Sequence, residues 1–201
     1  MNSLNFIGQS DAGILVSSYF SRALKSMKEI DQTQILELLS LLKNIRKSRA
    51  TVFIAGNGGS ASTAEHIALD WMLGTSLSNP SLRVISLAVS SASITATGND
   101  VSFDAVFSRQ LKSLANKGDL LVVISASGNS ANLVGLVQEA KGMGVQVVAI
   151  TGFDGGHLAQ EVDLTVHVPT AIGDYGVAED LHLMIGHIVK EVLIAEEKSG
   201  I

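Results

Sequence analysis

Hydrophobic residues recur at helical spacing over the first 48 residues of the chain. One set predicts a helix over residues 10–28 and consists of Ile14, Tyr19, Phe20, Ala23, Leu24 and Met27. A second set predicts a helix over residues 31–48 and consists of Ile35, Leu38, Leu39, Leu42 and Ile45. Asp31, with Gln34 three residues later, predicts a capping box at the start of this second helix. Because both helices precede any strand, residues 1–48 are expected to form a helical oligomerisation segment.

Short apolar runs separated by helix-like segments occupy residues 49–201. The runs lie at 52–55, 83–89, 119–124, 145–150 and 164–168. Helical spacing follows the first run and returns at about 101–116, 130–142 and 156–161. Most runs are nearly continuous in Val, Ile and Leu, as in strands that are covered on both faces. The alternation predicts one α/β domain with a five-stranded parallel sheet flanked by helices, and ligand sites at the carboxyl ends of the strands.

The first strand leads into a glycine-rich turn, Gly56-Asn57-Gly58-Gly59-Ser60, at the start of a helix. Glycine permits backbone conformations that a Cβ forbids, and N–H groups at a helix start suit an anion, usually phosphate. His66 and Asp70 are four residues apart and share one face of that helix. This pattern suits proton or metal chemistry on a phosphorylated molecule, although such turns and single polar residues also occur as structural features.

A second turn with hydroxyl groups, Ser125-Ala126-Ser127-Gly128-Asn129-Ser130, follows the third strand. Three serines exceed what a helix cap needs, so the turn favours phosphate binding over an ordinary cap. Gly98-Asn99-Asp100 suits either a contact to a sugar hydroxyl or a simple turn, and Gly152–Gly156 predicts a turn.

The last helix, predicted over Val177–Glu196, carries polar residues among apolar ones. Glu179 and Asp180 stand eight and seven residues before His187, so each can point with it into one cavity. His182 is expected to be a core or interface residue, and His187 alone would be read in the same way.

Composition excludes several classes of function. Charged residues make up only 16% of the chain and the mean hydropathy is +0.35, which favours an oligomer with apolar helix surface buried between subunits. A net charge of −5 argues against nucleic-acid binding, and the basic run Lys43–Arg49 suits a helix end. No apolar run approaches the roughly 20 residues of a membrane span. Residues 1–13 lack the features of a secretory signal, and the absence of cysteine excludes disulfides and Cys-based zinc sites. A cytoplasmic location fits.

Five segments, in this order and spacing, resemble the SIS (sugar isomerase) domain family, and in particular the phosphoheptose isomerases. They are GNGGSASTAEH, TGNDVSFDAVFSRQL, ISASGNSAN, AITGFDGG and EDLHLMIGHI. The resemblance covers residues 10 to 195. It implies an aldose–ketose isomerase that converts sedoheptulose 7-phosphate to a heptose 7-phosphate through an enediol. The family works as a homotetramer with sites shared between subunits and often holds zinc.

The resemblance also implies roles for individual residues. Substrate contacts fall on Asn57, Gly58, Gly59, Asn99, Asp100 and Glu179, with the phosphate on Ser125, Ser127 and Ser130. Metal ligands fall on His66, Asp70, Glu179 and His187. Asp70 would be the catalytic base and His187 its acid partner.

The chain departs from the family pattern at three places. Asp70 replaces a glutamate and Glu179 replaces a glutamine. The family helix continues with a Thr-Gly-Arg segment after the glutamate, whereas this chain reads Trp71-Met72-Leu73-Gly74, without the arginine. A base displaced by about 1 Å can lose on the order of 100-fold in rate. Two alternatives therefore stand beside heptose isomerisation: an isomerase of another phosphosugar, and a non-catalytic adaptor that binds sugar phosphate or associates with the DnaA replication initiator.

Overall fold

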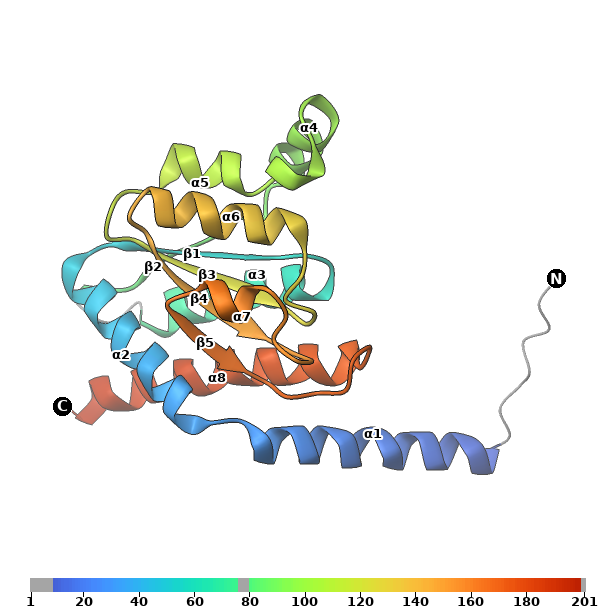
Figure 1. Ribbon diagram of the computed structural model, residues 1–201. Helices are drawn as coiled ribbons and strands as arrows, with labels where there is room; N and C mark the ends of the chain where they lie inside the picture. The colour runs from blue at the N-terminus through green and yellow to red at the C-terminus, as the bar shows by residue number, and fades with distance from the viewer. Residues whose placement is uncertain (1–8, 76–79, 200–201) are drawn as a thin grey trace.

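The computed structural model describes residues 9–75 and 80–199 of the chain (Figure 1). Its strands are β1 (Thr51–Gly56), β2 (Arg83–Ser86), β3 (Leu120–Ser125), β4 (Gln146–Thr151) and β5 (Leu164–His167). Its helices are α1 (Gln9–Glu29), α2 (Gln32–Ser48), α3 (Gly59–Gly74), α4 (Ser91–Asp100), the short 3-10 helix η1 (Phe103–Ala105), α5 (Ser108–Leu114), α6 (Ala131–Gly142), α7 (Leu158–Glu161) and α8 (Tyr175–Ser199). Residues 1–8 of the predicted oligomerisation segment lie outside the described residues, and the division at residue 48 stays a prediction.

The five strands form one parallel sheet in the order β2-β1-β3-β4-β5. The chain leaves β1 toward β2 and then returns to the other side of β1 with β3, so the strand order reverses between β1 and β3. All residues of β1 and β3 are buried, which explains their continuous apolar sequences. The predicted five-stranded parallel sheet is confirmed.

Helices cover both faces of the sheet, as Figure 1 shows. Alternate residues of each strand point to opposite faces, so Val52 and Ile54 pack with α2, α3 and α8, whereas Phe53 and Ala55 pack with α5, α6 and α7. The face that carries α3 and α8 is the one that concerns the predicted His66, Asp70 and His187.

Helix α1 extends along and beyond the body of the protein (Figure 1). Two side-chain bonds attach it near the start of α8: the Tyr19 hydroxyl donates to Asp180 at 2.6 Å, and Arg22 Nε donates to Asp174 at 2.7 Å. Its exposed apolar residues are Ile14, Leu15, Val16, Phe20, Leu24 and Met27. Within the described ranges, no helix is both long enough and apolar enough to cross a membrane.

Three local predictions were wrong in part. The Asp31 side chain caps α2 by accepting from Thr33 N at 2.9 Å, but Gln34 does not complete a capping box, because its Oε1 accepts from His167 N at 2.8 Å. The run 83–89 ends as a strand at Ser86. The helix predicted at 101–116 is divided into η1 and α5, and a further helix, α4, precedes both. Helix α4 starts at a Ser90 cap and buries only Thr97 among its residues, so apolar spacing did not indicate it.

Helices α3 and α8 approach closely at Gly186. A Cβ built at Gly186 would lie 2.4 Å from Cγ1 of the buried Ile67, and the Gly186 carbonyl accepts from Trp71 Nε1 at 3.0 Å. A side chain at this position is therefore incompatible with the observed separation of the two helices. His187 follows Gly186 and His66 precedes Ile67, so this contact sets the distance between the two histidines.

We expect Gly186→Ala to lower the free energy of unfolding by about 1–3 kcal/mol, because overpacking a buried contact costs this much. Gly135→Ala in α6 is the matched control. No atom lies within 4 Å of a Cβ at Gly135, so this variant should gain up to about 1 kcal/mol from helix propensity. Urea unfolding of the two variants and the parent measures both effects. A Gly186→Ala variant as stable as Gly135→Ala would contradict the close packing.

Candidate functional site

A cavity of about 160 Å³ lies at the carboxyl ends of β1 and β3. This is the point where the strand order reverses, and parallel sheets bind ligands there. The residues that line it are Asn57, Ser60, Ile124, Ser125, Ala126, Ser127, Ser130, Leu133, Tyr175 and Glu179. The structure therefore brings together both predicted turns and the start of α8.

The serine turn presents its hydroxyl groups in different ways. Ser125 is buried, and its Oγ accepts from Gly128 N at 3.0 Å, which folds the turn back on itself. Ser130 occupies the cap position of α6, but its side chain makes no capping hydrogen bond. Because Ser130 lines the cavity instead, the ordinary serine-cap interpretation does not describe it. The start of α6 adds the positive end of a helix dipole to this wall of the cavity.

Glycine is required at the centre of the serine turn. Gly128 has φ +66°, and a Cβ there would meet the Gly155 carbonyl oxygen at 2.0 Å. The predicted turn at residues 152–156 thus packs against the serine turn, and Leu158 N donates to the Gly128 carbonyl at 2.9 Å. This packing and this hydrogen bond hold the serine turn against the second turn.

Two contacts define the glycine-rich turn: a pair of side-chain amides, Asn57 and Asn132, and the carboxylate of Glu179, which lies against Gly59. Asn57 and Asn132 exchange two side-chain hydrogen bonds of 2.8 and 2.9 Å, which tie the start of α3 to α6. A Cβ at Gly59 would overlap the Glu179 carboxylate. Glu179 therefore supplies a negative charge at the positive end of α3, where the sequence predicted an anion.

His66, Asp70 and His187 form a compact cluster about two helical turns beyond the cavity. The Nε2 atoms of His66 and His187 are 3.3 Å apart, and Asp70 Oδ2 lies 3.6 Å and 3.5 Å from them. The histidine side chains are nearly half exposed, 48% and 46%, whereas the Asp70 side chain is 12% exposed. The cluster thus opens to solvent on its imidazole side. Glu179 is not a member of this cluster.

The geometry of the three donor atoms fits zinc. Zinc bonds of about 2.0–2.2 Å place neighbouring ligand atoms of a tetrahedron about 3.3–3.6 Å apart. The observed distances of 3.3, 3.5 and 3.6 Å match one face of such a tetrahedron. Two imidazole nitrogens and one carboxylate oxygen are also a typical catalytic zinc set, in which the fourth position stays open.

Two residues of the site were not predicted. Lys190 Nζ donates to Asp70 Oδ1 at 2.7 Å. Lys190 follows His187 by three residues, so the helical spacing of α8 could have indicated that the two side chains lie on the same face. Tyr175 lines the cavity and packs edge-on against Phe153, with ring centroids 4.9 Å apart. Phe153 adopts φ +47°, an uncommon conformation for a residue with a side chain. No sequence pattern indicated Tyr175.

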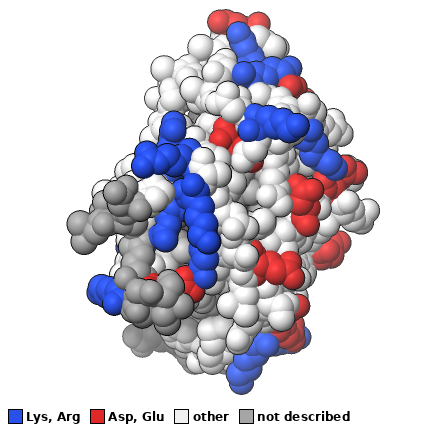
Figure 2. Space-filling model, turned by 90° about the vertical axis from the view of Figure 1, so that its left-hand side faces the viewer, with Lys and Arg blue, Asp and Glu red and all other residues white. Residues whose placement is uncertain are grey.

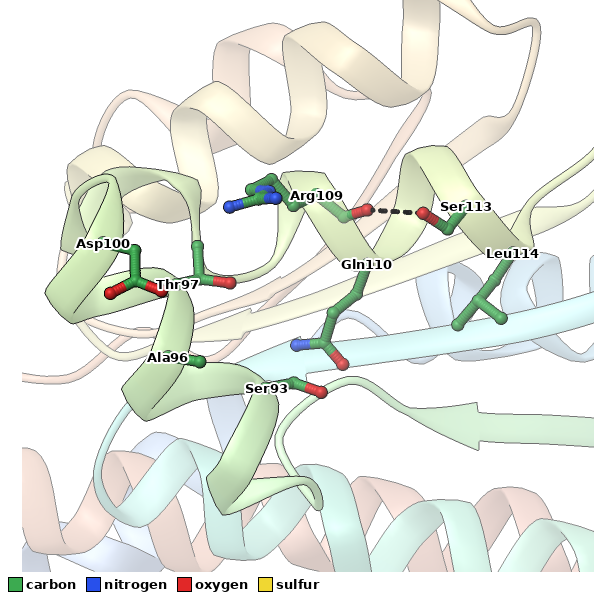
Figure 3. A pocket seen from close by; sticks show the side chains of 8 residues that line it. All are labelled: Ser93, Ala96, Thr97, Asp100, Arg109, Gln110, Ser113 and Leu114. Carbon is green, nitrogen blue, oxygen red and sulfur yellow. Dashed lines mark hydrogen bonds between the residues drawn. The ribbon is translucent and has the colours of Figure 1, made fainter.

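Asn99 and Asp100 lie apart from this cavity, in the last turn of α4 rather than in a turn after β2. Asn99 Nδ2 donates to Asp100 Oδ1 at 2.8 Å. Asp100 lines a different cavity of about 410 Å³ between α4 and α5, into which Arg109 and Gln110 also point (Figure 3). The structure of one chain therefore does not bring these two residues to the serine turn.

The basic run near the end of α2 belongs to a surface of mixed charge. Lys43 Nζ pairs with Glu196 of α8 at 2.6 Å, and α2 ends with Arg46 and Lys47 in its last turn. On the face shown in Figure 2, basic side chains lie beside acidic ones and beside broad uncharged areas. This face therefore carries charges of both signs.

His182 is a core residue, as the sequence predicted. It is fully buried, and neither ring nitrogen has a hydrogen-bond partner among the described residues. Burial is the largest cause and lowers the pKa of His182 to about 4. The Thr151 backbone raises this pKa by a smaller amount. The ring is therefore neutral at physiological pH and lies outside the cluster of His66, Asp70 and His187.

Known proteins resemble the chain over most of its length. A family model described as the SIS domain matches residues 17–152. A phosphoheptose isomerase of Sulfurimonas denitrificans is 33% identical over 190 residues, which are 90% of this chain and 96% of that protein. Another from Burkholderia pseudomallei is 41% identical over 138 residues, or 69% of each chain. These matches confirm the resemblance on which the predicted site residues rest.

Solved structures agree with these sequence matches. The phosphoheptose isomerase of Neisseria gonorrhoeae superposes with a TM-score of 0.83 at 29% identity, covering 92% of this chain and 99% of that one. The corresponding protein of Francisella tularensis gives a TM-score of 0.79 at 28% identity, covering 96% and 98%. The fold is thus shared along nearly the whole chain.

We expect the buried His182 to make the protein sensitive to acid. Above pH 6.5 the ring is neutral in both the folded and the unfolded chain, so it has no effect. Between pH 6.5 and pH 4 the unfolded chain binds a proton that the fold excludes, so stability falls as the pH falls, by about 3 kcal/mol in total. Urea unfolding of the parent and His182→Met across this window measures the difference.

His157→Gln is the control, because His157 lies on the surface with a half-exposed side chain. Its stability should fall with pH as steeply as that of the parent. A His182→Met variant with the same slope as the parent would show that His182 does not exclude a proton.

Proposed function

The chain belongs to the SIS domain family, and we propose that it is an aldose–ketose isomerase that interconverts sedoheptulose 7-phosphate and a heptose 7-phosphate. One observation carries the proposal: a cluster of two imidazoles and a carboxylate stands near a cavity lined by serine hydroxyls. The relatives named phosphoheptose isomerase support the reaction class.

The serine turn is the proposed phosphate site. Ser127 and Ser130 line the cavity, and the start of α6 directs its dipole toward the same wall. Hydroxyl and backbone N–H donors are sufficient for a phosphate without a lysine or arginine. Binding energy gained at this end of the substrate places the reacting carbons at the other end.

The separation between cavity and cluster suits a long sugar chain. His66 follows Ser60 by six residues and His187 follows Glu179 by eight, which corresponds to about 9 Å along α3 and about 12 Å along α8. An extended chain advances about 1.2 Å per bond, so C2 of a heptulose 7-phosphate lies about 8 Å from phosphorus. In a pentulose 5-phosphate this distance is about 6 Å. The longer substrate is therefore the better match.

Proton transfer is assigned to the cluster. Asp70 takes the proton from the carbon next to the carbonyl, and His187 gives a proton to the carbonyl oxygen, which produces the enediol. Where zinc is bound, His66, Asp70 and His187 would hold it, and the metal would polarise that carbonyl oxygen in place of the proton from His187. Glu179 is proposed to contact a substrate hydroxyl. To serve as a further metal ligand, its carboxylate would have to move away from its position against Gly59.

We further propose a homotetramer in the cytoplasm. The exposed apolar side chains of α1 support burial against other subunits, since Phe20 alone is 65% exposed. In such an assembly Asn99 and Asp100 would contact the sugar in the site of a neighbouring subunit, which would account for their distance from the cavity in their own chain. Phosphorylated sugars as substrates support the cytoplasmic location.

The direct test is a panel of ketose phosphates with five to seven carbons, assayed for aldose formation with and without added zinc. We expect sedoheptulose 7-phosphate to give the highest kcat/KM. A preference for a shorter ketose would assign another phosphosugar. Binding without turnover on the whole panel, with no zinc retained, would leave a sugar-phosphate-binding adaptor.

Asp70→Asn should lower kcat by at least about 100-fold, because a positioned general base contributes 10²–10⁴-fold. Binding of the sugar phosphate, measured by calorimetry, should change little, since the serine turn is intact. Asp31→Asn is the control for the same chemical change, because asparagine also caps helices well and Asp31 lies at the start of α2. Full activity of Asp70→Asn would refute the assignment of the base.

A further inference from the structure

We propose that Lys190 is a positioning residue that holds the Asp70 carboxylate with Oδ2 directed at His66 and His187. The proposal rests on the function proposed above, in which Asp70 is the base and a zinc ligand. It concerns how this chain orients a carboxylate that is one methylene shorter than the glutamate of the family pattern.

The two oxygens of Asp70 face different partners. Oδ1 accepts from Lys190 Nζ at 2.7 Å, the length of a charge-assisted hydrogen bond. Oδ2 lies 3.6 Å from His66 Nε2 and 3.5 Å from His187 Nε2. A carboxylate rotates broadly about its last torsion, so a bond to one oxygen determines where the other points. Lys190 therefore leaves one oxygen for a metal ion or a proton.

Packing of its aliphatic stem directs the Lys190 ammonium. A Cβ at Gly74, the last residue of α3, would lie 3.0 Å from Lys190 Cγ and 3.7 Å from Cδ. The stem thus passes over the end of α3 where glycine leaves room for it. Lys190 follows His187 by three residues, so the two side chains lie on the same face of α8. The ammonium consequently reaches Asp70 from a fixed direction.

Zinc affinity of the metal-free full-length protein tests the proposal without an activity assay. Partners of metal-binding carboxylates contribute 10–100-fold to affinity, so Lys190→Met should weaken zinc binding by about 10-fold or more in competition with a chelator. If Lys190 acts through Asp70, the same change in an Asp70→Asn background should alter affinity by less than about 3-fold. Tighter zinc binding by Lys190→Met would mean that the ammonium only repels the cation, and would overturn the proposal.

Lys43→Met is the matched control. Lys43 of α2 forms a 2.6 Å ion pair with Glu196, which lies on α8 as Lys190 does. The exposed fractions of the two lysine side chains are similar, 36% for Lys43 and 33% for Lys190. This variant should leave zinc affinity and turnover unchanged. A similar loss of zinc affinity in both variants would show a general effect of removing an ion pair from α8, and would also overturn the proposal.

Kinetics give a second measure. Lys190→Met should lower kcat about 10-fold with less than a 3-fold change in KM, because the phosphate site is untouched. Gly74→Ala retains the ammonium but displaces the stem, and should change kcat and zinc affinity in the same direction by a smaller factor. If Lys190→Met and Gly74→Ala are both as active as the parent protein, the role of Lys190 is refuted and the proposed function stands. If the parent protein itself is inactive on every ketose phosphate, the proposed function is refuted instead.

Discussion

The close contact between α3 and α8 at Gly186 is the constraint on which the site depends. Each helix carries part of the cluster, His66 and Asp70 on α3 and His187 on α8, and neither helix alone can assemble it. The missing side chain at Gly186 lets Ile67 occupy the space where a Cβ would lie. Nitrogen atoms more than a hundred residues apart in the chain are then 3.3 Å apart. Helix packing is thus a direct requirement for the proposed chemistry.

The sheet determines where the phosphate end of the site lies. The reversal of strand order between β1 and β3 opens a crevice at their carboxyl ends, and the two polar turns meet there. The Asn57–Asn132 amide pair and the packing of Gly128 against Gly155 hold the turns in place. Such preorganisation lets binding energy at the phosphate serve the reacting carbons.

Two of the three departures from the family pattern, at Asp70 and at residues 71–74, occur next to each other in space. Asp70 is shorter than glutamate, and its carboxylate is held by Lys190 from α8. Gly74, in the segment that lacks the arginine of the family pattern, leaves room for the lysine stem. A change that seemed to weaken the site in the sequence is accompanied by a compensating contact in the fold.

The parallel sheet, the two polar turns and the buried state of His182 could all be predicted from the order of residues, because periodicity and turn chemistry are local properties. The order of residues did not indicate α4, which has a serine cap but almost no buried face. Tertiary structure alone decided that Gln34 bonds to β5, that Glu179 lies against Gly59, and that Lys190 holds Asp70. These contacts join residues from separate elements, and their distances depend on how the helices pack on the sheet.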